Sequence, residues 1–308
     1  ARARLEQAET VIAVHRGALG DFLQTWPALC SLVKHWPDKN FLWAGRTDRH
    51  LWTEPLGLRP CPADLRRAVE SIPGAQTWPD KLAKAAVIWF GLHKPPTDLR
   101  FPQLLFLPGI RPGEFIPPRE IYAQGLKQAG TLHDHDWLST WRHLFGLSRP
   151  PACDNATVLL FPGAGHPLRC WPMDRFRMLA DWLAQEGMQP CFVLGPAEMD
   201  HDLRVQDFEH TVLWDLDALQ ALLVRARLVV GNDTGPLHLA GYLGLPVISL
   251  FGPSSPDQWA PLGARVITLD KPCSPCSQTG RIHCRNPVCM TDIACAEVQQ
   301  SVTAILNF

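Results

Sequence analysis

The 308-residue sequence has no apolar run near the ~18 residues that a transmembrane helix requires, so no membrane span is expected. Its first ten residues lack the apolar stretch of a signal peptide, which predicts a cytoplasmic chain. Charge of one sign is not in excess either. The 29 Lys and Arg against 30 Asp and Glu exclude a generic binder of polyanions, so no nucleic-acid partner is expected. Glycine and proline are scattered, which excludes collagen, coiled coil and disorder.

What the sequence does have is a large supply of apolar side chains, 46% of all residues. At about 100–200 residues per domain, the length predicts two domains. The Pro-rich segment 148–153 places their boundary, with an N-terminal domain over 1–150 and a C-terminal domain over 151–308. The last helix can pack back on the first domain. Residues 1–150 hold 19 Lys and Arg against 14 Asp and Glu, so the first domain favours an anionic partner or an anionic membrane face.

Short β-branched runs alternate with helical stretches along the chain, which predicts βαβ units. In the first half the expected strands cover 11–14, 41–44 and 85–90. A helix is expected from Asp21 to about Trp36, kinked or restarted at Pro27. Residues 93–118 hold too many prolines for regular structure, so long loops are expected there.

The second half repeats the same unit more clearly. Its expected strands cover 156–161, 190–194, 211–214, 227–230 and 246–251, and its expected helices cover 173–186, 197–208, 216–225, 236–243 and 296–306. The fold class is therefore α/β, with two Rossmann-like doubly wound domains facing a cleft. Ligands of such sheets bind at the carboxyl ends of the strands.

The segment GNDTGPLHLA at 231–240 joins an expected strand to an expected helix. Pro suits the first helical position, and the bare amides at the helix start form an anion site suited to a diphosphate. Asp233 can accept hydrogen bonds from sugar hydroxyls. An ordinary helix cap by Asp or Thr is the alternative. The candidate binding residues are Asp233, Thr234, Gly235, Pro236 and His238.

The segment GALGD at 17–21 occupies the equivalent turn of the first domain. It is neither a dinucleotide fingerprint, since the third glycine is absent, nor a Walker A loop. Gly17 and Gly20 let backbone approach a ligand closely. Asp21 at the helix start is either an N-cap or a general base that takes a proton from an acceptor hydroxyl.

A third strand–loop–helix turn covers FPGAGHPLRCWP at 161–172. Gly165 lies in this loop and is a further candidate binding residue. Arg169, just before the helix, can clamp a phosphate with its planar guanidinium. An exposed loop arginine without such a role is the alternative.

Together these three turns, with LGLPVISLFGPSSP at 243–256, resemble the bacterial ADP-heptose:lipopolysaccharide heptosyltransferases, glycosyltransferase family nine. The similarity covers nearly the whole chain and is strongest over 11–36 and 156–305. The resemblance implies the GT-B architecture, with the nucleotide sugar held by the second domain and the acceptor by the first.

The resemblance also implies roles for individual residues. Asp21 matches the family's catalytic base for an inverting displacement at the anomeric carbon, and Asp233 matches the residue that holds donor hydroxyls. Arg169 stands where many members have Lys in a K-x-W-P run, which keeps the charge and changes its shape. The remaining matches are Thr234, Gly235 and His238 around the diphosphate and Glu198 at the ribose.

Such a site needs neither a metal nor a cofactor. Three D-x-D runs, at 134–136, 200–202 and 215–217, are therefore read as accidental rather than as cation sites. A cluster of four cysteines lies near the C-terminus: Cys273, Cys276, Cys284 and Cys289. They fit either a structural zinc site or reduced loop thiols with an occasional disulfide, and the sequence leaves this choice open.

The sequence thus predicts a metal-independent, inverting heptosyltransferase that moves heptose from ADP-heptose to the inner core of lipopolysaccharide. We expect a cytoplasmic monomer that touches the inner membrane face at its periphery and binds an anionic glycolipid acceptor. Two alternatives stay open: a GT-B transferase with a different nucleotide sugar or glycan acceptor, and a non-catalytic nucleotide-sugar-binding module. A nucleotide-sugar epimerase or dehydrogenase is disfavoured, because neither tyrosine forms a Tyr-x3-Lys pair.

Overall fold

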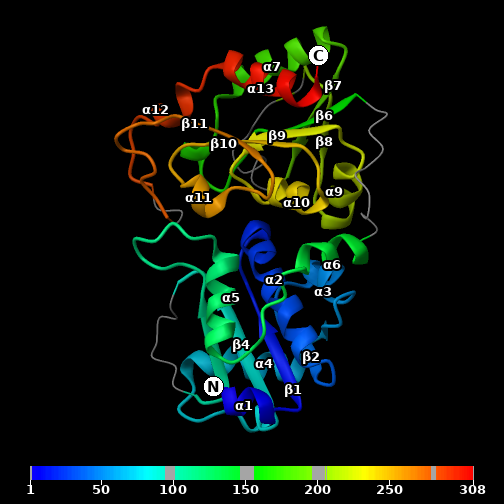
Figure 1. Ribbon diagram of the computed structural model, residues 1–308, viewed down its shortest axis with the longest axis vertical. Helices are drawn as coiled ribbons and strands as arrows, with labels where there is room; N and C mark the ends of the chain where they lie inside the picture. The colour runs from blue at the N-terminus through cyan, green and yellow to red at the C-terminus, as the bar shows by residue number, and fades with distance from the viewer. Residues whose placement is uncertain are drawn as a thin grey trace. The chain divides into compact units, whose positions relative to one another are not determined.

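The computed structural model describes residues 2–93, 101–145, 156–195, 205, 207–278 and 282–307. The chain divides into two compact units, unit 1 over Ala1–Leu144 and unit 2 over Phe145–Phe308. Each unit is built around one parallel sheet with helices (Figure 1). None of the helices in the described ranges is both long enough and apolar enough to cross a bilayer.

Unit 1 contains a five-stranded parallel sheet in the order β3-β2-β1-β4-β5. Its strands are β1 (Thr10–Val14), β2 (Asn40–Trp43), β3 (Arg59–Pro60), β4 (Ala85–Gly91) and β5 (Leu104–Pro108). Its α-helices are α1 (Arg2–Gln7), α2 (Leu19–His35), α3 (His50–Thr53), α4 (Ala63–Ser71), α5 (Pro118–Gln128) and α6 (Trp137–Leu144). Three 3₁₀ turns complete it: η1 (Thr47–Arg49), η2 (Ile72–Gly74) and η3 (Asp80–Leu82).

The central strand β1 is enclosed, with residues 11–14 all buried, as expected for a parallel strand covered on both faces. Helix α2 is enclosed as well, since every residue from Phe22 to Leu32 is buried. Helices α5 and α6 pack against α2. The indole rings of Trp26 and Trp141 meet at 4.9 Å where α2 contacts α6.

The structure corrects two expectations for unit 1. Helix α2 runs unbroken through Pro27 and does not restart there. An interior proline costs about 3 kcal/mol, and the burial of α2 offsets it; Ser31 also donates its hydroxyl to the Pro27 carbonyl at 2.9 Å. The loop expected over 93–118 contains β5, because the prolines leave the apolar run at 104–107 uninterrupted. Residues 94–100 lie outside the described ranges.

Unit 2 contains a six-stranded parallel sheet in the order β11-β10-β9-β6-β7-β8. Its strands are β6 (Thr157–Phe161), β7 (Gln189–Leu194), β8 (His210–Val212), β9 (Leu228–Asn232), β10 (Val247–Phe251) and β11 (Arg265–Thr268). Its α-helices are α7 (Met173–Gln185), α9 (Leu216–Leu223), α10 (Gly235–Leu243), α11 (Pro256–Trp259), α12 (Val288–Thr291) and α13 (Cys295–Leu306). A 3₁₀ turn, η4 (Pro167–Arg169), precedes α7.

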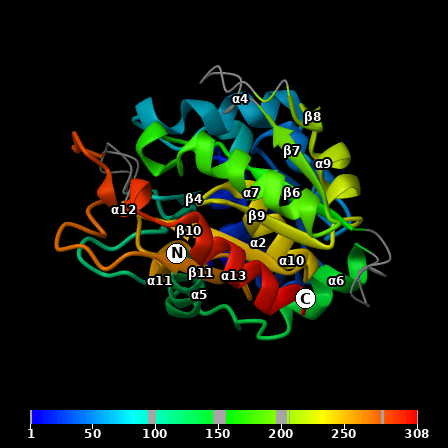
Figure 2. The same ribbon diagram turned by 90° about the horizontal axis from the view of Figure 1, so that it is seen from above.

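The core of unit 2 joins the sheet to α7 and α13, which lie side by side (Figures 1 and 2). Helix α13 contributes its apolar face, including Val298, Val302 and Leu306, to this core. The two parallel sheets confirm the predicted α/β, doubly wound fold class. Strand β11 was not expected. The linker at 148–153 and most of the helix expected over 197–208 lie outside the described residues.

All strand pairs within each sheet are parallel, so the carboxyl ends of neighbouring strands share one edge of the sheet. In unit 1 this edge carries the turn after β1 and the loop after β2. In unit 2 it carries the turns after β6, β9 and β10. Every sequence-predicted site residue that the structure describes lies on one of these two edges.

Candidate functional site

The turn between β9 and α10 is fixed by the buried side chain of Asn232. Its Oδ1 accepts a hydrogen bond from the Trp171 amide at 2.9 Å, and its Nδ2 donates to the Pro162 carbonyl at 2.7 Å. These two bonds tie the β9–α10 turn to the loop after β6. The two predicted donor-binding segments of unit 2 therefore form one surface.

Helix α10 begins without a side-chain cap. Thr234 precedes it in an extended conformation (φ −151°, ψ 159°) and its hydroxyl makes no capping bond, which argues against the ordinary-cap alternative. Gly235 and Pro236 form the first turn and are partly exposed, while His238 is buried within the helix. An uncapped helix start offers backbone amides and the positive end of the helix dipole to an anion.

Asp233 is buried between two partners. Its Oδ2 accepts a hydrogen bond from the Ser254 hydroxyl at 2.6 Å and lies 3.4 Å from a guanidinium nitrogen of Arg169. Burial raises the pKa of Asp233, and the Arg169 charge and the Ser254 hydrogen bond partly offset that effect. The hydrogen bond from Ser254 and the charge of Arg169 thus hold the carboxyl group in place.

Arg169 ends the 3₁₀ turn η4. His166 caps the start of this turn, because its Nδ1 accepts a hydrogen bond from the Leu168 amide at 3.2 Å. The Arg169 side chain is 16% exposed, and its buried Nε has no hydrogen-bond partner. Gly165, in the same loop, is exposed and has open space around it. The loop thus brings a cation with an unused donor beside Asp233.

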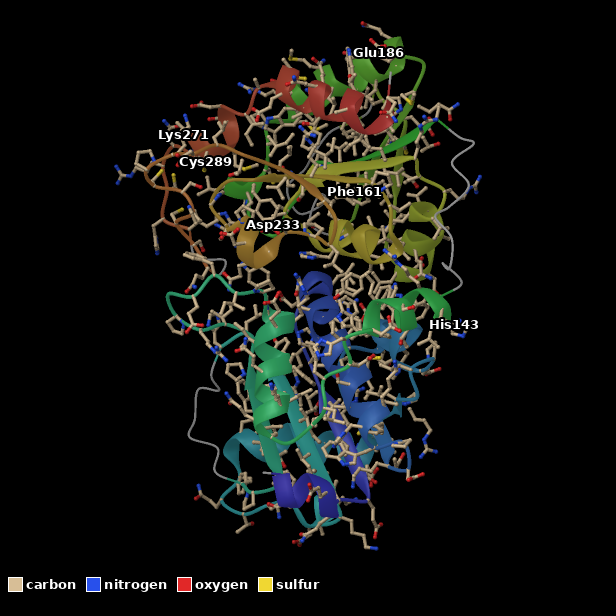
Figure 3. The ribbon with its side chains drawn as sticks, viewed as in Figure 1. His143, Phe161, Glu186, Asp233, Lys271 and Cys289 are labelled. Atoms are coloured by element: carbon tan, nitrogen blue, oxygen red, sulfur yellow. The ribbon has the colours of Figure 1, made fainter. Side chains whose placement is uncertain are left out.

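The segment 252–255 after β10 completes this edge of unit 2. Ser254, whose hydroxyl holds Asp233, is itself fixed by the cysteine-rich loop, because the amides of Cys276 and Ser277 both donate to the Pro253 carbonyl at 2.9 Å. Figure 3 labels Phe161 at the end of β6, Asp233 after β9, and Cys289 in the cysteine-rich part of the unit. Sequence reasoning quoted GPSSP as a motif without assigning Ser254 a role.

In unit 1 the turn between β1 and α2 carries Asp21. The carboxylate lies in the first turn of α2, where its Oδ2 accepts the Ala18 amide at 3.3 Å. This bond is one half of a capping box. Asp21 is partly buried, and Gly20 forms the same helical turn. A Cβ at Gly17 would lie 2.9 Å from Asp21 Oδ2, so glycine is needed for the carboxylate to occupy this place.

The four loop cysteines gather in one region of unit 2. Burial, and then the neighbouring thiols, raise the pKa of both Cys276 and Cys289. Cys273 and Cys276 are exposed, while Cys289 is buried. Among the described residues, no three His, Cys, Asp or Glu side chains come together closely enough to hold a metal ion. The choice between a structural zinc site and reduced thiols therefore stays open.

The D-x-D runs in the described ranges have structural partners. Asp134 pairs with Lys34 at 2.9 Å and accepts from the Cys30 thiol at 3.3 Å, which joins the loop before α6 to the end of α2. Asp215 caps α9 by accepting the Ala218 amide at 2.7 Å. The run at 200–202 and the candidate ribose residue Glu198 lie outside the described residues.

Sequence reasoning missed Trp214. This side chain follows the carboxyl end of β8 by two residues and is 68% exposed, whereas Trp26, Trp43, Trp52, Trp141 and Trp171 are fully buried. An exposed aromatic ring offers a flat face on which a nucleotide base can stack. Its place at the carboxyl edge of the sheet makes it a further candidate for ligand binding.

The fold of this chain is similar to solved structures along nearly its full length. It matches the structure of a family 9 glycosyl transferase from Veillonella parvula over 97% of both chains, with a TM-score of 0.70 and 19% identity. It matches Escherichia coli ADP-heptose lipopolysaccharide heptosyltransferase II over 97% of this chain and 98% of the other, with a TM-score of 0.64 and 19% identity. These likenesses establish the GT-B fold.

Sequence comparison assigns the chain to a family within this fold. Residues 127–287 match the model of glycosyltransferase family 9 (heptosyltransferase), and the chain belongs to this family. It is 36% identical over 124 residues to lipopolysaccharide heptosyltransferase 2 of Escherichia coli K12, a match that spans 35% of this chain and 35% of that relative. The matched region of the family model contains the β6, β9 and β10 turns of unit 2.

Proposed function

We propose that this protein is an inverting glycosyltransferase that moves heptose from ADP-heptose onto the inner core of lipopolysaccharide. The proposal is supported by membership of family 9 and by relatives named as lipopolysaccharide heptosyltransferases. The observation that carries it is the β9–α10 edge, where an uncapped helix start lies beside the Arg169–Asp233 pair. This arrangement suits a ligand with a diphosphate next to a sugar rich in hydroxyls.

In the proposed reaction Asp21 takes the proton from an acceptor hydroxyl. The acceptor oxygen forms a bond to the anomeric carbon of heptose from the face opposite the diphosphate, and the bond from that carbon to the phosphate oxygen breaks. ADP leaves with the bonding electrons. The α10 amides and Arg169 offset the charge that develops on the diphosphate, which lowers the barrier.

Residues of unit 2 divide the donor between them. Asp233 holds heptose hydroxyls, while Thr234, Gly235 and the α10 start face the diphosphate. Arg169 can contact both the heptose and the diphosphate. One of its guanidinium nitrogens lies 3.4 Å from Asp233, and its Nε has no hydrogen-bond partner in the protein. Trp214 offers an exposed ring at the carboxyl edge on which the adenine base can stack.

Unit 1 takes the acceptor in this proposal. The excess of Lys and Arg in residues 1–150 suits an anionic glycolipid, and the same charge favours peripheral contact with the cytoplasmic face of the inner membrane. We further propose a cytoplasmic monomer whose reaction involves no metal, no cofactor and no nucleic acid.

Calorimetry with ADP-heptose, ADP-glucose and UDP-glucose tests the donor. We expect ADP-heptose to bind most tightly and UDP-glucose least, because both the sugar and the base are read by unit 2. Equal, weak binding of all three would remove the donor assignment. A transfer assay with heptose-deficient lipopolysaccharide, followed by the mass gain of one heptose, tests the acceptor.

The same experiments separate the alternatives. A transferase with another donor or acceptor would bind or use a different member of the panel. A non-catalytic binding module would bind ADP-heptose and release no ADP in the presence of acceptor, and Asp21→Asn would change nothing. Release of ADP that depends on both acceptor and Asp21 excludes the module.

A further inference from the structure

Two residues beside Asp21 have no role in the function proposed above. His15 follows β1 directly, and Arg49 ends the 3₁₀ turn η1 after β2. Strands β1 and β2 are parallel neighbours, so both residues lie on the same carboxyl edge as Asp21. Both are also buried, each with 3% of its surface exposed. A buried arginine and a buried histidine at the same edge as the proposed base call for an explanation.

The space around Gly17 shows how close His15 is to Asp21. A Cβ placed on Gly17 would lie 2.9 Å from Asp21 Oδ2 and equally 2.9 Å from Cε1 and Nε2 of His15. The carboxylate and the edge of the imidazole therefore flank one point. Because Gly17 has no Cβ, that point is empty, and the carboxylate and the imidazole both border it.

Phe22 links Arg49 to the same group. This ring follows Asp21 in α2 and is completely buried. The guanidinium carbon of Arg49 lies 5.6 Å from its centroid, and the His15 ring centroid lies 6.2 Å from it. Arg49 and His15 thus both pack on the residue that directly follows Asp21 in α2.

The charges of these groups act on one another. Burial lowers the pKa of Arg49 to about 10, while the carboxylates of Asp48 and Asp21 act in the opposite direction. Burial, followed by the charge of Arg49, lowers the pKa of His15 to about 3. Burial, followed by the charge of Asp21, raises the pKa of Tyr122 on α5. Near neutral pH, Arg49 is therefore charged, while His15 and Tyr122 are neutral.

The guanidinium of Arg49 is only partly paired. A guanidinium nitrogen lies 3.1 Å from Asp48 Oδ2, whereas the buried Nε makes no hydrogen bond. Burying a charge that is only partly paired costs several kcal/mol. A structural role alone would be served as well by an apolar side chain of the same size.

We propose that His15 and Arg49 are positioning residues for Asp21, with the neutral imidazole fixing the direction of the carboxylate and the buried guanidinium keeping it ionised. The inference rests on the proposed role of Asp21 as the base. His15 itself cannot serve as that base, because a group that stays unprotonated down to about pH 3 takes no proton from a sugar hydroxyl at neutral pH.

The first test needs no substrate. In protein labelled with ¹³C at the aspartate carboxyls, the Asp21 resonance is assigned by its loss in Asp21→Asn, and its titration midpoint is compared between wild type and Arg49→Met. The midpoint rises by about 1 pH unit in Arg49→Met, because a nearby cation favours the charged carboxylate. Arg49→Lys, which keeps the charge, stays near wild type.

Two further variants serve as a control and as a second test of the role of Arg49. Arg46→Met removes an exposed cation that is also paired with Asp48, and leaves the midpoint unchanged. Asp48→Asn removes the carboxylate that competes for Arg49, and lowers the midpoint. Asp48 is exposed, so this variant also decides the question if Arg49→Met does not fold. Equal midpoints in wild type, Arg49→Met and Asp48→Asn overturn the role of Arg49.

His15 is tested by turnover. His15→Phe keeps an aromatic ring without a hydrogen-bonding nitrogen, and we expect kcat to fall about 10-fold with the dissociation constant for ADP-heptose unchanged. His15→Asn restores part of the loss. An unchanged kcat in His15→Phe overturns its role. If Asp21→Asn keeps full turnover, the proposed function fails instead, whereas a dead Asp21→Asn with normal His15 and Arg49 variants rejects only the positioning.

Discussion

The two units present the same device, an aspartate in a strand–turn–helix junction, in two different environments. In unit 1 the Asp21 carboxylate lies in the first turn of α2, partly exposed, with a backbone amide on one oxygen. In unit 2 the Asp233 carboxylate precedes α10 and is buried between Arg169 and Ser254. Both junctions lie at the carboxyl edge of a parallel sheet.

The difference teaches which carboxylate can react. A general base must reach its substrate and change protonation during the reaction, which suits the partly exposed Asp21. A carboxylate locked by a cation and a hydroxyl suits the recognition of sugar hydroxyls instead. We therefore expect changes at the unit 1 junction to alter turnover, and changes at the unit 2 junction to alter donor affinity.

Replacing the unit 1 carboxylate gives the largest expected effect. Asp21→Asn keeps the shape and removes the base, so kcat falls about 10³-fold while calorimetry finds an unchanged dissociation constant for ADP-heptose. Initial rates of ADP release in the presence of acceptor measure the fall. Asp38→Asn, an exposed change in the same unit, is the control and keeps wild-type rates. A weaker donor affinity in Asp21→Asn would break the comparison between the junctions.

Local sequence signals predicted the elements that carry these junctions. The strands at β1, β6 and β9 are short apolar runs, and the helix at α10 is announced by Gly-Pro at its start. Strand β5 was missed because prolines nearby obscured a run of only five residues. Strand β11 and helices α4, α5 and α6 were missed too, because elements this short show no clear apolar period and owe their stability to packing.

The partners inside each site were not predictable in the same way. Ser254 reaches Asp233 across 21 positions of sequence, and Arg49 joins the Asp21 group across 28. Both contacts arise because neighbouring parallel strands bring their carboxyl ends to one edge. The strand order decides which loops meet there, and a single sequence does not encode that order in any local pattern.

The cation of the unit 2 junction gives the second largest effect. Arg169→Met removes the partner of Asp233 and the charge near the diphosphate, so the dissociation constant for ADP-heptose rises about 30-fold, or ~2 kcal/mol. Arg169→Lys recovers most of the affinity, because it keeps the charge. Calorimetry measures both. Arg177→Met, on the exposed face of α7, serves as the matched control. Unchanged affinity in Arg169→Met would remove Arg169 from the donor site.

The two junctions also respond to pH in opposite directions. The pKa of His15 is about 3 in the folded chain and about 6.5 in an unfolded one, so the unfolded chain alone gains a proton as pH falls below 6.5. Between pH 7 and pH 5 this costs unit 1 about 2 kcal/mol of stability. Asp233 has a raised folded pKa, so its contribution is present at low pH and lost as pH rises.

Hydrogen exchange of the β1 amides, corrected for intrinsic rates, measures the unit 1 response. His15→Gln removes most of the stability difference between pH 7 and pH 5, whatever its effect at either pH. His143→Gln, at an exposed position of α6, keeps the wild-type difference. If His15→Gln leaves the difference intact, the imidazole is not buried in its neutral form.

Replacing Trp214, which follows β8 in unit 2, gives the smallest expected effect. It tests whether unit 2 residues govern donor affinity alone. Its ring is exposed at the carboxyl edge, and stacking of a base on such a ring contributes about 1–3 kcal/mol. Trp214→Ala therefore raises the dissociation constant for ADP about 10-fold, and Trp214→Phe restores much of it. At saturating donor, kcat stays at the wild-type value, because the ring touches no reacting atom. Met178→Ala, which removes another exposed apolar side chain of unit 2, leaves ADP affinity unchanged. A fall in kcat at saturating donor would show that unit 2 residues also govern turnover, and the division between the two junctions would no longer hold.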